Sequence, residues 1–229
     1  MEYETVLFRD SVLFDPLMEQ NKKINISLAY PKITGVLIKP GEILSVCKLI
    51  GNQSKRKGYK VARVLKCNKP AREIGGGLCQ LSNMIHYLAL HSPLTVIERH
   101  NHDWADLYPE FGKQIPFGTG ASVLYNYIDL RIKNNTSLTY QIVLSIKDNH
   151  LCGELRSNLP QAETFRLETV DSCFIREKGE VYKNGRVLRH SMNEDGEISH
   201  TAELVSYHAK VLYDTSVLDK IIDKTEDFL

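Results

Sequence analysis

The sequence predicts an α+β fold in which a glycine-rich turn and a helix pack on a mainly antiparallel β-sheet. After residue 78, four apolar residues recur with the i, i+3, i+4 and i+7 spacing of one buried helix face: Leu81, Met84, Ile85 and Leu88. Downstream of this helix, apolar residues alternate with a period of two, which is typical of half-buried strands. Short turn signals separate these strands, so neighbouring strands are expected to pair in antiparallel fashion.

Upstream of this helix, the chain contains shorter elements. Residues 11–28 fit a short helix that is broken near Pro16. Residues 36–38 have the character of a short strand, which ends at the turn signal Pro40-Gly41. Residues 42–50 fit either a strand or one or two helical turns, and the pattern does not decide between them.

Downstream of the helix, strands are expected over residues 94–97, 123–132, 138–146, 151–155 and 203–213. Asn184-Gly185 lies between two apolar segments and predicts a two-residue hairpin turn, because both central positions of such a turn need a positive φ. Ser216 is expected to cap a short C-terminal helix that includes Val217 and Ile222.

The composition limits the classes of function. The chain has 229 residues, 42% of them hydrophobic, which suits one large domain with a substantial core. A net charge of +1 argues against a protein dedicated to nucleic-acid binding. Residues 48–72 nevertheless contain nine basic side chains and no acid, whereas residues 161–229 contain fourteen acids and nine lysines and arginines. The basic stretch could attract an anionic ligand, a membrane surface or the acidic C-terminal part of the fold, or it could be a solvated face.

Five cysteines are present, and no two of them form a C-x-x-C pair. The odd number favours reduced thiols over a disulfide framework. The N-terminal residues have neither a basic region nor an apolar segment typical of a secretion signal, and no run approaches the ~18 apolar residues of a membrane span. We therefore expect a cytoplasmic protein without a transmembrane segment.

Three glycines and a leucine, Gly75-Gly76-Gly77-Leu78, lead directly into Cys79 at the expected start of the helix. Glycine permits left-handed or crowded backbone conformations. The dipole and the unpaired N–H groups of a helix N-terminus favour negative charge and lower the pKa of a thiol. Cys79 is therefore a candidate nucleophile, with glycine-flanked amides as its oxyanion hole. The alternative is a tight turn before a core helix, in which Cys79 is a small buried hydrophobe.

A cysteine nucleophile needs a base and a group that orients the base. His100 and His102 follow the strand after the helix, and Asp129 lies on the next clear strand. Papain- and transglutaminase-like enzymes have the same order of cysteine at a helix start, histidine at a strand and acid on the following strand. This is an analogy at the level of the fold.

Other interpretations of the histidines remain open. The pair His100-Asn101-His102 could bind zinc together with Cys79 or an acid. Arg99 and His102 could instead belong to a buried polar network. His86 follows Cys79 by seven residues and lies roughly on the same helix face, where it is more typical of a core or boundary histidine than of a ligand.

Several segments resemble the VanW family, which takes its name from a protein encoded in vancomycin B-type resistance clusters. The most specific match is GGGLCQLSN at residues 75–83. Weaker matches lie at residues 40–42, 58–59, 91–100, 116–123, 125–130, 203–205 and 209. The resemblance implies an N-terminal extension over residues 1–24, a VanW-like domain over 25–213 and a helical tail over 214–229. Cys47 and residues 101–113 depart from the family pattern.

The resemblance also implies an association with glycopeptide resistance or cell-wall precursor metabolism. We expect a hydrolase or acyl-transferase site in which Cys79 attacks a carbonyl, His102 acts as general base and then acid, and Asp129 orients His102. The substrate would be a small molecule or peptide, such as a cell-wall precursor, and no metal or cofactor is expected. The expected binding residues are Gly76, Gly77, Gln80, Arg99 and His100. The alternative is a non-enzymatic binding protein for an anionic ligand related to the cell wall.

Overall fold

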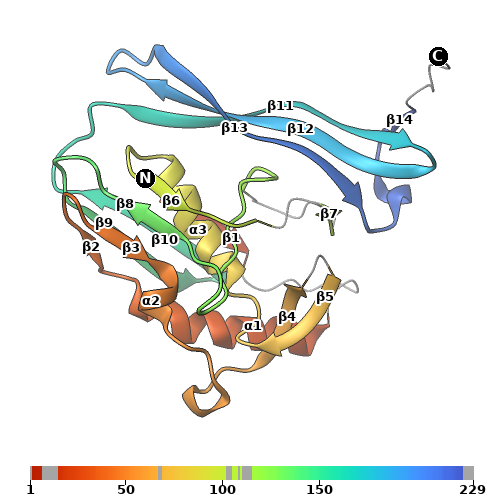
Figure 1. The fold of residues 1–229 in the computed structure, drawn as a ribbon, viewed down its shortest axis with the longest axis horizontal. Helices are drawn as coiled ribbons and strands as arrows, with labels where there is room; N and C mark the ends of the chain where they lie inside the picture. The colour runs from red at the N-terminus through yellow and green to blue at the C-terminus, as the bar shows by residue number, and fades with distance from the viewer. Residues whose placement is uncertain are drawn as a thin grey trace.

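The computed structural model describes residues 2–6, 15–66, 69–101, 105–107, 109 and 115–223. These residues form three α-helices and mostly antiparallel sheets, which confirms the α+β class (Figure 1). The helices are α1 (Pro16–Ala29), α2 (Val46–Ile50) and α3 (Cys79–Leu90). No helix within the described ranges has the length and apolar character needed to cross a membrane.

Side chains cap the first two helices. α1 begins at Pro16 and is not broken there, because proline suits the first helical position, where its missing N–H would have no partner. The Asp15 carboxylate accepts a hydrogen bond of 3.0 Å from the Leu17 N–H. α2 begins after Ser45, whose hydroxyl accepts the Lys48 N–H at 3.1 Å. Residues 42–50 thus use both expected alternatives in turn, strand β3 (Ile43–Ser45) followed by α2.

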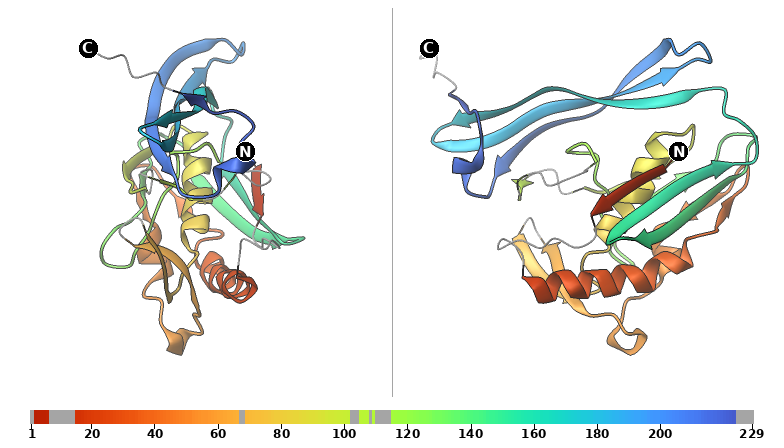
Figure 2. Two further views of the ribbon diagram at one scale, coloured as in Figure 1. Left: turned by 90° about the vertical axis from the view of Figure 1, so that its right-hand side faces the viewer. Right: turned by 180° about the vertical axis from the view of Figure 1, so that it is seen from behind.

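The main body contains two sheets and α3. One sheet has the order β1-β10-β9-β2, with β1 (Glu2–Val6), β10 (His150–Ser157), β9 (Tyr140–Lys147) and β2 (Leu37–Ile38). The other has the order β3-β8-β6, with β8 (Arg131–Lys133) and β6 (Thr95–Glu98). α3 lies against the first sheet (Figure 2), where a Cβ on Gly153 would come within 2.7 Å of Met84 Sδ. All four apolar residues of the expected helix face are buried in the core, which confirms that prediction.

An elongated sheet lies across the top of the body in Figure 1. Its order is β14-β11-β12-β13-β7, with β14 (Ile222–Asp223), β11 (Thr164–Glu177), β12 (Glu180–Met192), β13 (Ile198–Val211) and β7 (Ala105–Asp106). The three long strands pair in antiparallel fashion, and the two short edge strands pair in parallel. On the opposite side of the body, the hairpin of β4 (Val61–Lys66) and β5 (Lys69–Ile74) lies beside α1.

Side chains of β12 and β13 connect the elongated sheet to the body. Arg189 of β12 donates from Nε to the Leu90 carbonyl at 2.8 Å and from Nη2 to the Ser92 carbonyl at 2.6 Å. These carbonyls lie at the C-terminal end of α3, where unpaired acceptors attract a cation. On the neighbouring strand β13, the Tyr207 ring meets the Phe117 ring edge-on, with 4.9 Å between centroids. Val205 of β13 also faces the body, since a Cβ on Gly118 would lie 3.0 Å from its Cγ1.

The hairpin turn expected at Asn184-Gly185 is not formed, because both residues lie inside β12. Gly185 pairs with Tyr207, and a Cβ on Gly185 would lie 2.3 Å from the Tyr207 hydroxyl oxygen. The glycine thus provides room for an aromatic ring across the strand pair. The turn between β11 and β12 is Lys178-Gly179 instead, with φ of 49° and 81°.

Two other expected elements differ from the structure. Only the end of the strand expected at 123–132 is formed, as β8, because Asn126 adopts a φ of 65° in a tight turn that pairs Leu124 with Ile128. In place of the C-terminal helix, Thr215–Val217 is a 3-10 turn capped by Asp214, and it is followed by β14. The strands expected at 138–146 and 151–155 are confirmed as the β9–β10 hairpin.

Candidate functional site

The triple glycine forms a tight turn packed between α1 and β4. Gly75 and Gly77 have φ of 79° and 90°, a conformation that residues with side chains rarely adopt. Gly76 lies against the β4 backbone, and a Cβ on it would be 2.4 Å from the Ala62 carbonyl oxygen. The fully buried Asn25 of α1 fixes the turn by donating from its amide to the Gly76 carbonyl at 2.9 Å. Each glycine therefore has a steric reason to be present.

Cys79 is the first residue of α3 and is partly exposed. Burial raises the pKa of its thiol, and this effect outweighs hydrogen bonds from the Val123 backbone and the Ser122 side chain, which lower the pKa. The lowered pKa expected for a helix N-terminus is therefore not realised. Cys79 is a thiol at neutral pH and needs a base to become a thiolate.

Polar side chains of α3 bind the extended segment 119–123. The Ser82 hydroxyl donates to the Ala121 carbonyl at 2.6 Å, and Asn83 Oδ1 accepts the Ala121 N–H at 2.7 Å. One turn later, His86 Nδ1 lies 2.8 Å from the Thr119 carbonyl oxygen. The segments 75–83 and 116–123, which are separate in sequence, thus form one structural unit.

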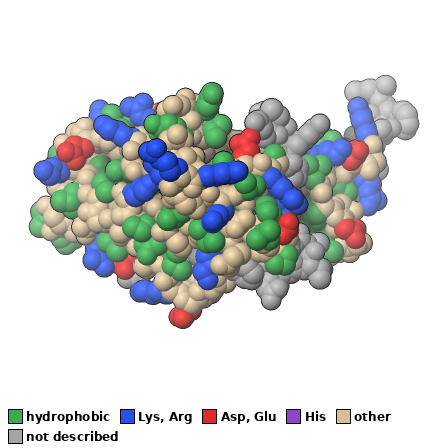
Figure 3. Space-filling model, turned by 90° about the horizontal axis from the view of Figure 1, so that it is seen from below, with side chains coloured by type: hydrophobic (Ala, Val, Ile, Leu, Met, Phe, Trp, Pro, Cys, Tyr) green, Lys and Arg blue, Asp and Glu red, His purple; other side chains and the backbone are tan. Residues whose placement is uncertain are grey.

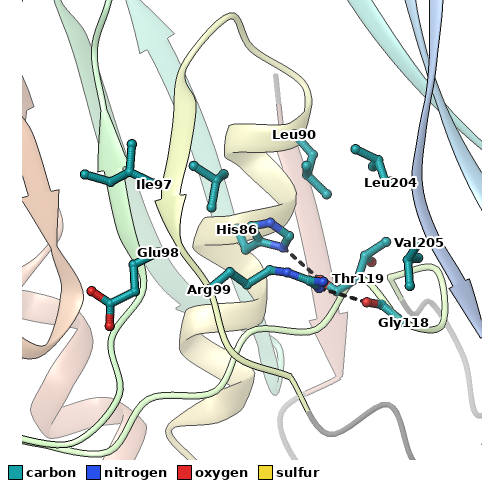
Figure 4. A pocket seen from close by; sticks show the side chains of 10 residues that line it. His86, Leu90, Ile97, Glu98, Arg99, Gly118, Thr119, Leu204 and Val205 are labelled. Atoms are coloured by element: carbon teal, nitrogen blue, oxygen red, sulfur yellow. Dashed lines mark hydrogen bonds between the residues drawn. The ribbon is translucent and has the colours of Figure 1, made fainter.

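Arg99, which directly follows β6, binds the same segment beside His86 (Figure 4). Its Nη1 donates to the carbonyl oxygens of Gly118 at 2.8 Å and Gly120 at 3.0 Å. Arg99 therefore takes part in a half-buried polar network, as one interpretation of the sequence expected. His102, its expected partner in that network, lies outside the described residues.

A cavity of about 280 Å³ opens beside this network (Figure 4). Its lining consists of His86, Leu90, Val96, Ile97, Glu98, Arg99, Gly118, Thr119, Leu204 and Val205. Burial, together with the nearby charge of Arg99, lowers the pKa of His86 to about 4, although the bond to Thr119 acts in the opposite direction. His86 is thus buried as expected, but it also lines a cavity. This position in a cavity wall could not be predicted from the sequence, because two lining residues come from β13, more than 100 positions downstream.

The Asp129 carboxylate is engaged at the start of α2. Oδ1 accepts the N–H groups of Cys47 and Leu130, both at 2.8 Å, and Oδ2 accepts the Ser45 hydroxyl. Burial and the charge of Asp129 raise the pKa of the Cys47 thiol to about 12. Asp129 thus serves as a capping group for α2, and Cys47 stays protonated at neutral pH.

The remaining expected site residues lie close to these groups in the chain. Gln80 is half-buried in the first turn of α3, next to Cys79. The exposed His100 has Nε2 at 3.3 Å from Glu98 Oε1, and this oxygen also accepts the Asp129 N–H at 3.0 Å. Within the described ranges, no group of three or more histidine, cysteine or acidic side chains could hold a metal ion. The expected contact between Cys79 and His102 involves a residue outside those ranges and stays a prediction.

The basic stretch at residues 48–72 is largely exposed. Five of its side chains reach solvent around α2, the 3-10 turn Lys55–Lys57 and the start of β4: Lys48, Lys55, Arg56, Lys57 and Lys60. Figure 3 shows lysines and arginines spread over the face seen from below, with few acids among them. This face lies beside α1 and the β4–β5 hairpin (Figure 1), on the side of the body opposite the elongated sheet.

Comparisons with known proteins agree with the sequence resemblance. A family model described as "VanW like protein" matches residues 21–156. Over 213 residues the chain is 30% identical to "Vancomycin B-type resistance protein VanW" of Enterococcus faecalis, which covers 93% of this chain and 77% of that protein. Over 115 residues it is 27% identical to "Uncharacterized protein YoaR" of Bacillus subtilis, which covers 50% of this chain and 36% of that protein. No solved structure gives a significant match. The chain belongs to the VanW family.

Proposed function

We propose that this protein acts in glycopeptide resistance or cell-wall precursor metabolism as a cysteine hydrolase or acyl-transferase with Cys79 as nucleophile. The observation that carries this proposal is the environment of Cys79, a half-buried residue at the start of α3 whose thiol is desolvated but receives hydrogen bonds from Ser122 and Val123. Such donors stabilise the thiolate once a base has removed its proton. The resistance protein of Enterococcus faecalis that the chain resembles supports the cellular process.

The proposed reaction has the same steps as that of a papain-like cysteine enzyme. The Cys79 sulfur attacks the carbonyl carbon of a peptide or amide, while His102 takes the thiol proton. Backbone N–H groups near Gly77 and Cys79 stabilise the oxyanion. His102 then returns the proton to the leaving amine, and water or a second amine releases the acyl group from the sulfur. Asp129 orients His102 while its carboxylate also caps α2.

The proposal is tested by the rate at which iodoacetamide labels Cys79, followed by peptide mapping. Because His102 acts as base, His102→Gln should slow labelling of Cys79 at neutral pH by about tenfold or more. The matched control His100→Gln should leave the rate unchanged. Cys79→Ser should abolish labelling of this peptide and fail to support glycopeptide resistance in a host that depends on the protein. Equal rates in the wild type and the His102 variant would refute the catalytic assignment.

A second candidate is non-enzymatic binding of an anionic ligand, and the exposed basic face favours it. Binding of this kind weakens steeply as salt concentration rises. A chain with Lys55, Arg56 and Lys57 replaced by glutamate should lose salt-sensitive binding to a polyanion such as polyphosphate, whereas Cys79→Ser should retain it. If the glutamate variant bound polyphosphate as well as Cys79→Ser does, the basic face would not be the binding site, and this candidate would be excluded.

A further inference from the structure

The cavity beside His86 and Arg99 is shaped by an irregularity in β13. Val187 pairs with Val205, but the next residue, Leu188, pairs with Glu203, so Leu204 is an extra residue in the strand. Consecutive side chains of a regular strand point to opposite faces. The bulge allows both Leu204 and Val205 to line the cavity (Figure 4). Bulges of this kind occur next to functional sites, where they redirect a side chain.

His86 presents a hydrogen-bond acceptor to this cavity. The Thr119 carbonyl can only accept a hydrogen bond, so His86 Nδ1 carries the proton that is donated to it. The low pKa keeps the ring neutral above pH 5, and Nε2 is then left with a lone pair. No described group donates to Nε2. His86 is only 3% exposed, which makes this unpartnered acceptor a feature of the cavity wall and not of the outer surface.

Arg99 adds a positive charge on the same wall. Only Nη1 of its guanidinium donates to the protein among the described residues, which leaves Nε and Nη2 for a ligand. Glu98 also lines the cavity, but Figure 4 shows its carboxylate turned away from the guanidinium. Glu98 is engaged with the Asp129 N–H at 3.0 Å and lies 3.6 Å from Arg131. The charge of Arg99 therefore dominates the interior.

We propose that the cavity binds a small carboxylate whose α-carbon carries a hydroxyl or an amide N–H and a short aliphatic group. The carboxylate pairs with Arg99, the hydroxyl or N–H donates to His86 Nε2, and the aliphatic group contacts Leu90, Leu204 and Val205. A volume of about 280 Å³ limits the bound part to about the size of an amino acid. This site does not depend on Cys79 being a nucleophile.

Calorimetric titration of the full chain with 2-hydroxyisovalerate tests the proposal. We expect saturable binding in the mM range, as befits a ligand of about eight heavy atoms. Isovalerate, which lacks the hydroxyl, should bind about fivefold more weakly, because His86 Nε2 then stays unpaired. 2-Hydroxyisovaleramide, which lacks the charge, should bind at least about tenfold more weakly. Absence of saturable heat up to about 20 mM of the hydroxy acid would overturn the proposal.

Two variants locate the binding within the protein. His86→Asn keeps an amide donor for the Thr119 carbonyl and removes Nε2. This variant should therefore bind the hydroxy acid and isovalerate with about equal affinity. Leu204→Trp fills the cavity and should abolish binding of both acids, with folding confirmed by circular dichroism. An unchanged hydroxyl preference in the histidine variant would overturn the assignment even if the tryptophan variant failed to fold. Cys79→Ser should bind like the wild type, so this result is independent of the labelling experiment.

Discussion

Gly76→Ala should destabilise the fold through a backbone collision and not through a change in φ. Gly76 is the one glycine of the signature turn without a positive φ. The added Cβ would lie 2.4 Å from the Ala62 carbonyl oxygen and 2.8 Å from the Arg63 carbonyl oxygen. Both atoms belong to the backbone of β4, which cannot rotate away as a flexible side chain would. The turn or the strand must therefore shift.

The cost follows from two effects. Overpacking of this kind costs about 1–3 kcal/mol. Movement of the turn also weakens the bond from the buried Asn25 amide to the Gly76 carbonyl, and an unpaired buried group costs about 1–3 kcal/mol. Together we expect the free energy of unfolding to fall by about 3 kcal/mol, which lowers the melting temperature by about 6–12 °C for a chain of this size.

Gly120→Ala is the matched control. Gly120 also has no positive φ, but its Cβ would meet only Asn83 Oδ1, at an ordinary contact distance of 3.5 Å. This substitution should change stability by less than about 1 kcal/mol. Urea denaturation monitored by circular dichroism measures both variants. Equal midpoints for the two would show that the triple glycine is not required for packing.

Two further predictions concern buried groups. Burial lowers the pKa of His86 from 6.5 to about 4, so the unfolded chain binds a proton in this pH range that the folded chain does not. The free energy of unfolding should therefore be unaffected by this group above pH 6.5 and should fall by up to about 3 kcal/mol as the pH falls to 4. Urea denaturation at several pH values measures this free energy, which should depend less on pH in His86→Asn than in the wild type. Arg189→Met removes the two hydrogen bonds from β12 to the end of α3, which should cost about 2–3 kcal/mol and speed hydrogen exchange in both elements. Arg189→Lys should restore part of this protection, and unchanged exchange in the methionine variant would contradict the proposed attachment.

Elements with a local cause were predictable from the sequence. The buried face of α3 and the β9–β10 hairpin follow from periodicities of 3.6 and 2, which neighbouring residues in the chain determine. One failure has a cause that is distant in sequence. Gly185 has the signature of a turn, but its real partner is the Tyr207 ring on the next strand. The break expected at Pro16 is wrong for a local reason, because proline suits the first position of a helix as well as it disrupts a helix interior.

In the candidate site, too, only the features with a local cause could be predicted from the sequence. The glycine turn and the helix start at Cys79 could be located from sequence, because glycines and a helical pattern adjoin there. The pKa of Cys79 could not, since it depends on burial in the folded chain and on hydrogen bonds from Ser122 and Val123, which are more than 40 positions away. The role of His86 was equally hidden. Its Nδ1 partner is 33 positions away, and the cavity in front of Nε2 requires the bulge in β13.

The Cys79 site and the cavity beside His86 lie on one face of α3, and the distance between them limits which ligands could occupy both. Cys79 and His86 are seven residues apart, which corresponds to about 10 Å along a helix and nearly two full turns. A ligand of amino-acid size in the cavity therefore cannot reach the sulfur. An extended peptide could, because each residue spans about 3.3–3.6 Å, and about three residues would connect a terminal carboxylate at Arg99 to a carbonyl at Cys79. In such a complex the cavity would hold the end of the peptide and so determine which carbonyl lies at the nucleophile. If the small acid binds but Cys79 proves unreactive, the cavity stands alone as a recognition site, and the binding function becomes the better description of the protein.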